Sequence, residues 1–314
     1  FAIWRRIVTI RDVRDCPTSG LFYGGRAGRK EGLLVDGEPW IAKYPRTTRD
    51  LVGKNLPSYT SSPISEYLGS HIFELAGIPV QQTELGYRNG KVVCLCKDFT
   101  YPDLRLFEFK ELKNSLSDDD EGFSSAPSDG ESVYLGDVLA AIETVPVLRD
   151  VVGVRERFWD MFVIDAFLKN PDRNNGNWGL LMDGDMTYSL APVYDLGSSL
   201  FSKRSDSVTA ARLDDPIDIE QDAFGTNVSC YKLAMPDGAS EAIHPFEYMR
   251  KTDNPDLRAA IARFAQAIDM DAVDGLIDSV PEEAYGIVLM TDVVRESHKR
   301  LLRYRFEEGI LPLI

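Results

Sequence analysis

The polar segment at residues 168–179 carries the side chains best suited to chemistry in this sequence. It reads Leu-Lys-Asn-Pro-Asp-Arg-Asn-Asn-Gly-Asn-Trp-Gly and lies between two apolar stretches. Asp172 and Asn177 stand in an Asp-x-x-x-x-Asn relation. At this spacing an Asp can accept the proton of an attacking hydroxyl while the Asn amide oxygen holds Mg²⁺, as phosphoryl transfer requires. A tight Asn/Gly turn would explain the same residues, so the rest of the sequence must decide between a turn and a catalytic segment.

A second carboxylate in a suitable setting follows shortly afterwards. Asp195 stands in Ala-Pro-Val-Tyr-Asp-Leu-Gly, at the end of an apolar stretch. A carboxylate there is placed to bind a metal ion, and Asp-Leu-Gly is similar to the Asp-Phe-Gly that holds Mg²⁺ in protein kinases. Capping of a turn by Asp195 is the alternative.

Residues 20–32 form a basic segment rich in glycine. Gly24, Gly25 and Gly28 precede Lys30 and an apolar run. Glycines at this density let backbone N–H groups approach phosphate oxygens closely, and the basic side chains add positive charge. The segment is not a Walker A loop, because the pattern G-x-x-x-x-G-K-[ST] does not occur. An ordinary turn between strands is the alternative.

Lys43 and Glu66 form a candidate ion pair. Lys43 ends the run Trp-Ile-Ala-Lys, where strand alternation puts Ile41 and Lys43 on one face that can line a cleft. A Lys one strand after a glycine-rich loop is where protein kinases bind the α- and β-phosphates. Glu66, at the start of the only helix expected in this region, would be its partner. An exposed strand Lys, and a Glu that complements a helix dipole, are the alternatives.

The order of these elements decides between the alternatives. Glycine-rich loop, strand Lys, helix Glu, Asp-x-x-x-x-Asn and Asp-Leu-Gly follow one another as they do in protein kinases. Together they supply charge neutralisation for a phosphoryl group, two metal-binding side chains and one proton acceptor. We therefore predict transfer of a phosphoryl group from ATP, with Mg²⁺ as cofactor.

The elements that must position these residues divide the chain into two parts. Apolar alternation around Asp-Gly and Asn-Gly turns predicts hairpins, and apolar residues at helical spacing predict helices. We predict an α+β, two-lobed protein-kinase-like fold, with a small β-rich ATP-binding N-lobe at residues 1–97 and a larger helical C-lobe at 98–314. The expected hairpins cover 33–43, 83–96 and 180–190, the expected helices cover 61–76, 154–169, 255–268, 271–279 and 282–307, and 115–131 is expected to be a loop.

Several stretches resemble the HipA-like serine/threonine protein kinases, especially a short branch that consists of the kinase lobes only. They are Gly24–Lys30, Trp40–Pro45, Pro63–Ile72, Lys97–Phe99, Asn170–Asn177 and Val193–Asp195, and they spread over roughly the first two-thirds of the chain. The resemblance implies that Asp172 is the catalytic base and that Asn177 and Asp195 bind Mg²⁺. It also implies that Lys43 binds the ATP phosphates and that residues 94–98, with Cys96 and Asp98, form the hinge beside adenine.

The sequence departs from this family's pattern near both loops. Many relatives carry a His two residues after the catalytic Asp, where this chain has Asn174. The toxin members are inhibited by phosphorylation of a Ser in the glycine-rich loop, and Thr18 and Ser19 lie just ahead of that loop as candidate autophosphorylation sites. The resemblance implies a protein substrate, such as an aminoacyl-tRNA synthetase, and an antitoxin partner, while other members are secreted signalling kinases.

Two further functions fit the same order of parts. A small-molecule kinase of the aminoglycoside type would have a closed acidic pocket formed by the C-terminal helices, whereas a protein kinase would have an open cleft. A pseudokinase that acts as a binding module would bind ATP without turnover, and Asn174 is the departure that favours it.

Composition excludes other classes of protein. The 314 residues are 44% hydrophobic, enough for a large core, but no apolar run approaches the ~20 residues that span a membrane. A net charge of −15 argues against direct nucleic-acid binding. Four cysteines without C-x-x-C spacing predict reduced thiols and a cytoplasmic protein, with secretion as an effector still open. Since the sequence starts with Phe1, we expect a short native leader to be missing.

The negative charge is concentrated in two segments. Residues 117–131 hold six acidic and no basic residues, and residues 213–222 hold five acidic and no basic residues. Residues 1–55 hold eleven Lys and Arg against six Asp and Glu. We therefore expect a basic ATP-binding lobe, and a substrate or partner with a basic segment whose capture weakens with salt.

Overall fold

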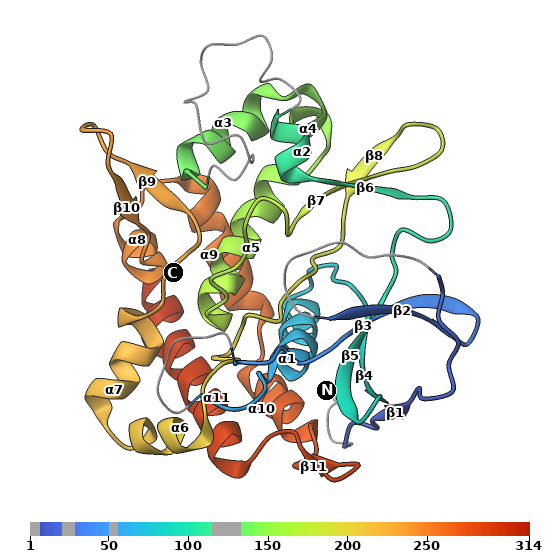
Figure 1. Ribbon diagram of the computed structural model, residues 1–314. Helices are drawn as coiled ribbons and strands as arrows, with labels where there is room; N and C mark the ends of the chain where they lie inside the picture. The colour runs from blue at the N-terminus through green and yellow to red at the C-terminus, as the bar shows by residue number, and fades with distance from the viewer. Residues whose placement is uncertain (1–6, 21–28, 50–55, 115–132) are drawn as a thin grey trace.

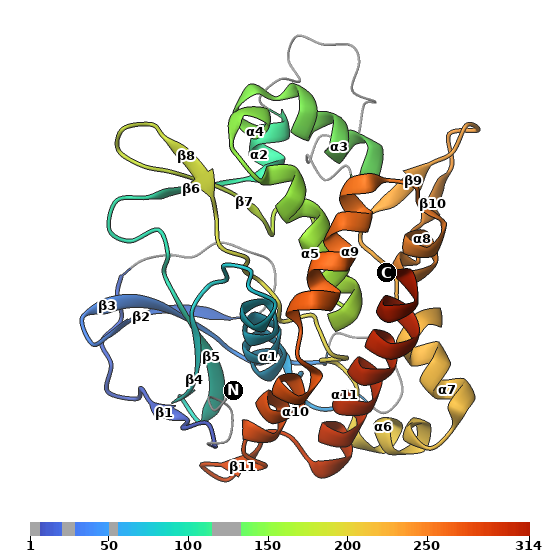
Figure 2. The same ribbon diagram turned by 180° about the vertical axis from the view of Figure 1, so that it is seen from behind.

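A β-rich lobe with one long helix lies beside a larger, mostly helical lobe (Figure 1, and Figure 2 from behind). This structure, a computed structural model, describes residues 7–20, 29–49, 56–114 and 133–314. The arrangement agrees with the predicted α+β, two-lobed fold. In the described parts of the chain, no helix is both long and apolar enough to cross a membrane.

A five-stranded sheet in the order β1-β4-β5-β3-β2 forms the core of the smaller lobe. Its strands are β1 (Arg11–Asp12), β2 (Lys30–Val35), β3 (Glu38–Lys43), β4 (Thr83–Arg88) and β5 (Lys91–Lys97). In the β2–β3 turn Asp36 and Gly37 have positive φ, as a two-residue turn between twisted strands requires. Asn89 and Gly90 do the same between β4 and β5. Both hairpins predicted in this lobe are therefore confirmed.

Helix α1 (Ser62–Leu75) joins this sheet to the larger lobe. It contacts β4 and β5 on one side and α10 (Met270–Ser279) on the other. Leu68 and Ile72 of α1 are fully buried in a hydrophobic core that also contains Leu85 of β4 and Leu276 of α10. Because one continuous core holds α1 from both sides, the orientation of this helix is fixed by packing.

The larger lobe is built around α5 (Val154–Leu168), which is buried on almost every side and packs against α9 (Pro255–Ala267). In Figure 1 and Figure 2 these two helices run side by side through the middle of the lobe. The other elements are β6 (Arg105–Glu108), α2 (Phe109–Asn114), α3 (Leu135–Thr144), α4 (Pro146–Asp150), β7 (Gly179–Met182), β8 (Tyr188–Leu190), α6 (Asp206–Leu213), α7 (Pro216–Glu220), β9 (Lys232–Ala234), β10 (Ser240–Ala242), α8 (Pro245–Lys251), β11 (Glu283–Ala284), β12 (Ile287–Val288) and α11 (Asp292–Tyr304), with π-helical turns at Gln221–Gly225 and Arg305–Ile310 and a 3₁₀ turn at Leu311–Leu313. The predicted helices over 61–76, 154–169, 255–268 and 271–279 and the hairpin over 180–190 are confirmed to within a residue or two.

The single helix predicted over 282–307 is wrong in its first part. Tyr285 and Gly286 both have positive φ and form the turn of the short β11–β12 hairpin. This conformation is incompatible with a helix, which begins only at Asp292. The apolar spacing around 287–290 instead places Met290 in the core.

The acidic segment at residues 213–222 is mostly helical and is not an open loop. It forms the end of α6, then α7 and a π-helical turn. Asp215 caps α7 by accepting a hydrogen bond from the Ile217 backbone N–H at 2.8 Å. Asp222 is 3% exposed and pairs with Arg204 and Arg212. Part of the acidic charge is therefore neutralised inside the protein, and the acidic loop predicted at 115–131 lies outside the described residues.

Gly179 offers a test of the pairing between β6 and β7, the strand that follows the polar segment at residues 168–178. A Cβ at this position would lie 2.0 Å from the backbone oxygen of Phe107 on the neighbouring strand. We expect Gly179→Ala to force the strands apart and to lower the free energy of unfolding by about 3 kcal/mol. Gly184→Ala, in the β7–β8 turn with no atom within 4 Å of the new Cβ, is the matched control. Equal urea midpoints for the two variants would show that β6 and β7 are not paired as described.

Candidate active site

Lys43 stands at the centre of a partly buried ionic cluster at the junction of the lobes. Its Nζ lies 2.8 Å from Oε1 of Glu66 on α1 and 3.1 Å from Oδ1 of Asp195. Burial alone would lower the pKa of Lys43, but Asp195 and Glu66 outweigh it, so that the pKa is raised well above its ordinary value. The same Lys holds the pKa of Asp195 below its ordinary value. Lys43 is therefore a fixed positive charge, and Asp195 is a carboxylate at neutral pH.

The backbone around Asp195 is shaped to bring this carboxylate to Lys43. Asp195 has a φ of +61°, a left-handed conformation that Asp adopts more readily than most residues. Two residues later, a Cβ on Gly197 would lie 3.0 Å from Oε2 of Glu66. The glycine of Asp-Leu-Gly thus lets the carboxylate of Glu66 approach the backbone closely, which explains why a glycine stands there.

Asp172 is held in place by its own loop. Asn174 donates from Nδ2 to Oδ1 of Asp172 at 3.0 Å, and Asn177 donates from Nδ2 to the Asp172 backbone oxygen at 2.6 Å. The Ser198 hydroxyl lies 3.5 Å from Oδ2 of Asp172. Burial raises the pKa of Asp172; the hydrogen bond from Asn174 opposes this, and the nearby carboxylate of Asp195 adds to it. A carboxyl with a raised pKa is a stronger base once it is ionised, which suits proton acceptance.

Arg173 ties the two functional loops together beneath Asp172. It is 2% exposed, and its guanidinium pairs with Asp165 of α5 at 2.8 Å. From Nη1 it also donates to the backbone oxygens of Asn177 at 2.7 Å and Tyr194 at 2.5 Å. One buried side chain therefore fixes the spacing between the loop of Asp172 and the loop of Asp195.

The residues predicted to bind a metal ion have the chemistry that Mg²⁺ requires. Asp195 offers carboxylate oxygens, and the hydrogen bond from Nδ2 of Asn177 directs its amide oxygen away from the Asp172 backbone. Mg²⁺ prefers oxygen ligands and commonly takes one or two from protein, the rest from phosphates and water. The described residues contain no group of three or more His, Cys, Asp or Glu side chains that could hold a metal by themselves.

A cavity of about 350 Å³ brings together five of the eight predicted site residues that the structure describes. It is lined by Lys30, Lys43, Glu66, Asp172 and Asp195. Residues that the sequence analysis did not single out complete its wall, among them Arg46, Ser62, Ser198 and Lys203. Gly24, Gly25 and Gly28 lie outside the described residues.

The structure does not bring the predicted hinge residues into this cavity. The Cys96 side chain is fully buried in the core, next to Cys94. The carboxylate of Asp98 accepts hydrogen bonds from the backbone N–H and the hydroxyl of Thr100 at 2.9 and 2.6 Å, so it stabilises a turn. The Asp98 backbone N–H donates to the Pro39 oxygen at 3.0 Å. Nucleotide contacts by Cys96 and Asp98 therefore stay a prediction from the resemblance.

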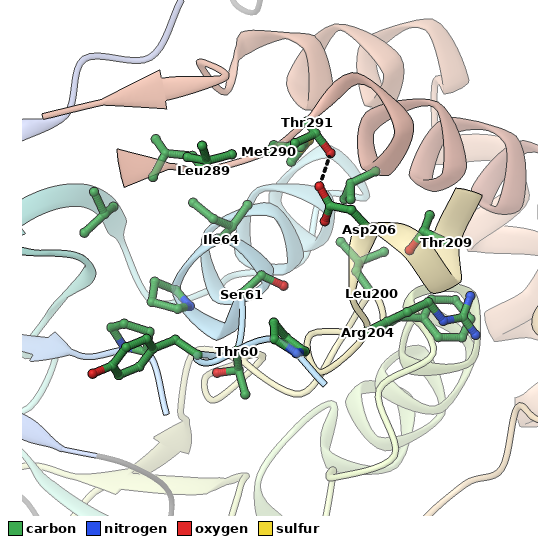
Figure 3. Close-up of a pocket in the computed structure, with 18 of the residues that line it drawn as sticks. Thr60, Ser61, Ile64, Leu200, Arg204, Asp206, Thr209, Leu289, Met290 and Thr291 are labelled. Carbon is green, nitrogen blue, oxygen red and sulfur yellow. Dashed lines mark hydrogen bonds between the residues drawn. The ribbon is translucent and has the colours of Figure 1, made fainter. Parts of the chain in front are cut away.

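A second cavity, of about 490 Å³, lies behind the start of α1 (Figure 3). It is lined by Ser61 and Ile64 of α1, by Leu200 and Arg204 from the segment after Asp195, and by the chain that leads into α11. Of the predicted site residues that the structure describes, none lines it. Five of them line the cavity around Lys43 instead, whereas Asn177, Cys96 and Asp98 line neither cavity.

Comparison with known proteins agrees with this geometry. The family described as "HipA-like C-terminal domain" matches residues 26–272, which is most of the chain. The chain belongs to the HipA-like family. This confirms the resemblance stated from the sequence.

Individual HipA-like relatives extend the match to nearly the whole chain. The "Serine/threonine-protein kinase CtkA" of Helicobacter pylori (strain J99) is 31% identical over 287 residues, covering 91% of this chain and 80% of the relative. A crystal structure of the H. pylori proinflammatory kinase CtkA covers 96% of both chains with a TM-score of 0.81 and 28% identity. A Shewanella oneidensis HipA, HipB and operator DNA complex covers 93% of this chain and 67% of the compared chain, but its TM-score of 0.49 and 14% identity carry no argument. The predicted two-lobed kinase fold is thereby confirmed, and the chain is a HipA-like kinase by family.

The sequence analysis missed the buried residues that support this HipA-like site. Asp165 and Arg173 were not predicted to pair, although Asp165 as the one charged residue in the apolar run at 161–168 was a signal. Ser198 and Lys203 carried no signal, because only the folded backbone places them beside Asp172.

Proposed function

We propose that this protein is a serine/threonine protein kinase that transfers the γ-phosphoryl group of Mg-ATP to a protein hydroxyl. One observation carries the proposal: Lys43 bridges Glu66 and Asp195 at 2.8 and 3.1 Å, and Asp172 lines the same cavity. A partly buried cation, an ionised carboxylate suited to a metal ion and a base in one cavity are what phosphoryl transfer requires of a protein. The names of the CtkA relatives support the same activity.

Each side chain has one role in this reaction. Lys43, oriented by Glu66, binds the phosphates of ATP. Asp172, oriented by Asn174, accepts the proton of the substrate hydroxyl. Asp195 and Asn177 would hold Mg²⁺, which would supply positive charge to offset that of the transferred phosphoryl group. Arg173 is a positioning residue, because it fixes both loops without reaching the cavity.

The charge of the cavity favours a protein kinase over the aminoglycoside type of small-molecule kinase. Its walls carry Lys30, Lys43, Arg46 and Lys203 against Glu66, Asp172 and Asp195. An acidic pocket built from the C-terminal helices, which polycationic small substrates would need, is not what surrounds Asp172. The aminoacyl-tRNA synthetase substrate, the antitoxin partner, the basic partner segment and the cytoplasmic location stay predictions from the sequence.

The assignment is tested by incubating the protein with γ-labelled ATP, Mg²⁺ and a Ser/Thr-containing protein substrate. Asp195→Asn removes a metal-binding carboxylate, so we expect label transfer to fall by roughly 10²-fold or more. Asp185→Asn, on the exposed β7–β8 turn, is the matched control and should transfer label like the wild type. Mass spectrometry of the labelled protein shows whether Thr18 or Ser19 is modified. If wild type and Asp195→Asn bind ATP equally but neither transfers label, the protein is a pseudokinase.

A further inference from the structure

A third cavity, lined by basic residues, adjoins the cavity around Lys43 on the side of Pro171. It has a volume of about 370 Å³ and is lined by Lys169, Lys203 and Arg204 together with three serines. Pro171, Ser198, Ser202 and Lys203 line both this cavity and the catalytic cavity, so the two share a wall. We call it the Lys169 cavity.

Lys169 has neutral partners in this cavity. Its ammonium group donates to the Thr226 hydroxyl and lies 4.0 Å from the centre of the Phe201 ring. Among the described residues, no carboxylate pairs with it. Lys169 also ends α5 with a φ of +53°, a conformation that favours glycine, so a long cationic side chain is kept at a strained position.

The charges behind the cavity leave an excess of positive charge. Asp222 pairs with both Arg204 and Arg212, and Asp218 pairs with Arg212. Arg305 is completely buried and donates to three backbone oxygens, those of Phe167, Asp222 and Ala223. The described ion pairs set two carboxylates, Asp218 and Asp222, against two arginines, Arg204 and Arg212, and the charges of Arg305, Lys169 and Lys203 come in addition.

Nearby arginines also shift the pKa of two groups beside this cavity. Burial first, then Arg305 and Arg204, lowers the pKa of Lys169 to about 7. Burial first, then Arg305, Arg204 and Arg295, lowers the pKa of His298 to about 4. Burial is the larger cause in both cases, and the positive charge of the arginines adds to it.

We propose that the Lys169 cavity binds a phosphate group on a peptide whose acceptor hydroxyl lies at Asp172. A phosphate dianion would offset the unbalanced cations and accept hydrogen bonds from Lys169, Lys203 and the serine hydroxyls. The position of the acceptor rests on the proposed function, whereas the anion site itself does not. The protein would then prefer a Ser or Thr close to a residue that is already phosphorylated.

The distance along the peptide follows from chain geometry. Lys169 and Asp172 are three residues apart, so their Cα atoms lie within about 11 Å of each other. An extended peptide advances about 3.3 Å per residue, which puts the phosphorylated residue within about four positions of the acceptor. The phosphate has two possible sources: a substrate protein, or a phosphorylated residue of this chain itself.

The direct test is fluorescence anisotropy of the full-length chain with a short labelled peptide. The peptide carries one phosphoserine and no free Ser, Thr or Tyr, so its binding does not depend on phosphoryl transfer. We expect the dephosphorylated wild type to bind it about tenfold more tightly than Lys169→Gln, and Lys169→Arg to bind like the wild type. Lys232→Gln, at an exposed lysine of β9, is the matched control and should also bind like the wild type.

Further outcomes identify the source of the phosphate or reject the site. If preincubation with Mg-ATP abolishes peptide binding, the chain's own phosphate fills the cavity; if binding persists, the site serves a substrate phosphate. Equal binding of the unphosphorylated peptide, or equal binding by folded Lys169→Gln, would overturn the proposal. A chain that binds the peptide through Lys169 but labels no protein would keep the anion site and contradict the proposed kinase.

Discussion

Asp172→Asn is expected to lower the rate of phosphoryl transfer by roughly 10²- to 10⁴-fold, the usual contribution of a general base. The amide has the size of the carboxyl group but cannot accept the proton of the substrate hydroxyl. Lys43 and Asp195 are untouched, so ATP should bind with nearly unchanged affinity. A labelled-ATP assay measured next to an ATP-binding titration separates the two effects. A variant that keeps more than a third of the wild-type rate would place the base elsewhere.

The pH dependence of the same reaction gives an independent check. Burial and the Asp195 carboxylate raise the pKa of Asp172, and the base must be ionised to act. The wild-type kcat/KM should therefore rise with pH through a midpoint above that of an ordinary Asp. The residual activity of Asp172→Asn should lack this rise.

The raised pKa of Asp172 also predicts the direction in which Asp172→Asn changes the stability of the folded protein. Because the pKa of Asp172 is raised in the folded state, the folded protein binds this proton more tightly than the unfolded chain does. The contribution of Asp172 to stability is therefore greatest below the ordinary Asp pKa and falls as pH rises through the raised pKa. At neutral pH Asp172→Asn should melt at or above the wild-type temperature, so lost activity cannot be attributed to unfolding.

The sequence was sufficient to predict the parts of the site that depend on local order. The Asp-Gly turn defines the hairpin that carries Lys43, and the Asn-Gly turn defines the second hairpin of the same sheet. Few other residues adopt positive φ at both central positions of such a turn. The pairing of Lys43 with Glu66 was also predictable, since the one helix between these hairpins has to pack on their sheet.

The sequence could not predict contacts that depend on the folded backbone. Alternation along β5 does not show that Cys96 faces the core while the neighbouring turn occupies Asp98. The acidic residues at 213–222 suggested an exposed segment. In the folded protein, however, Arg204 lies close to Asp222 and pairs with it, so that this carboxylate is buried. In the sequence Lys169 is one more residue of a polar segment. The arginines that make its surroundings positive lie far along the chain and come close only in the folded protein.

Lys43→Met is expected to destabilise the folded protein by about 3–5 kcal/mol, the usual cost of removing one partner from a buried ionic cluster. Glu66 is 2% exposed and would lose the cation that compensates its charge. Asp195 lies beside it and would repel it. The free energy of unfolding from urea titration measures this loss. ATP affinity should fall as well, since the phosphates lose their cation.

The matched control is Lys97→Met on the neighbouring strand. Lys97 pairs with Glu38 at 2.6 Å, but both side chains are about a third or more exposed, so its loss should cost at most about 1 kcal/mol. Adding Glu66→Gln to Lys43→Met removes the uncompensated carboxylate and should recover part of the stability, although not ATP binding. The second substitution would then restore stability without restoring ATP binding. This result would show that Glu66 and Lys43 are kept as charges for the phosphates of ATP, because a neutral pair would serve the fold as well. If the double variant is less stable than Lys43→Met, Glu66 stabilises the fold through contacts other than Lys43.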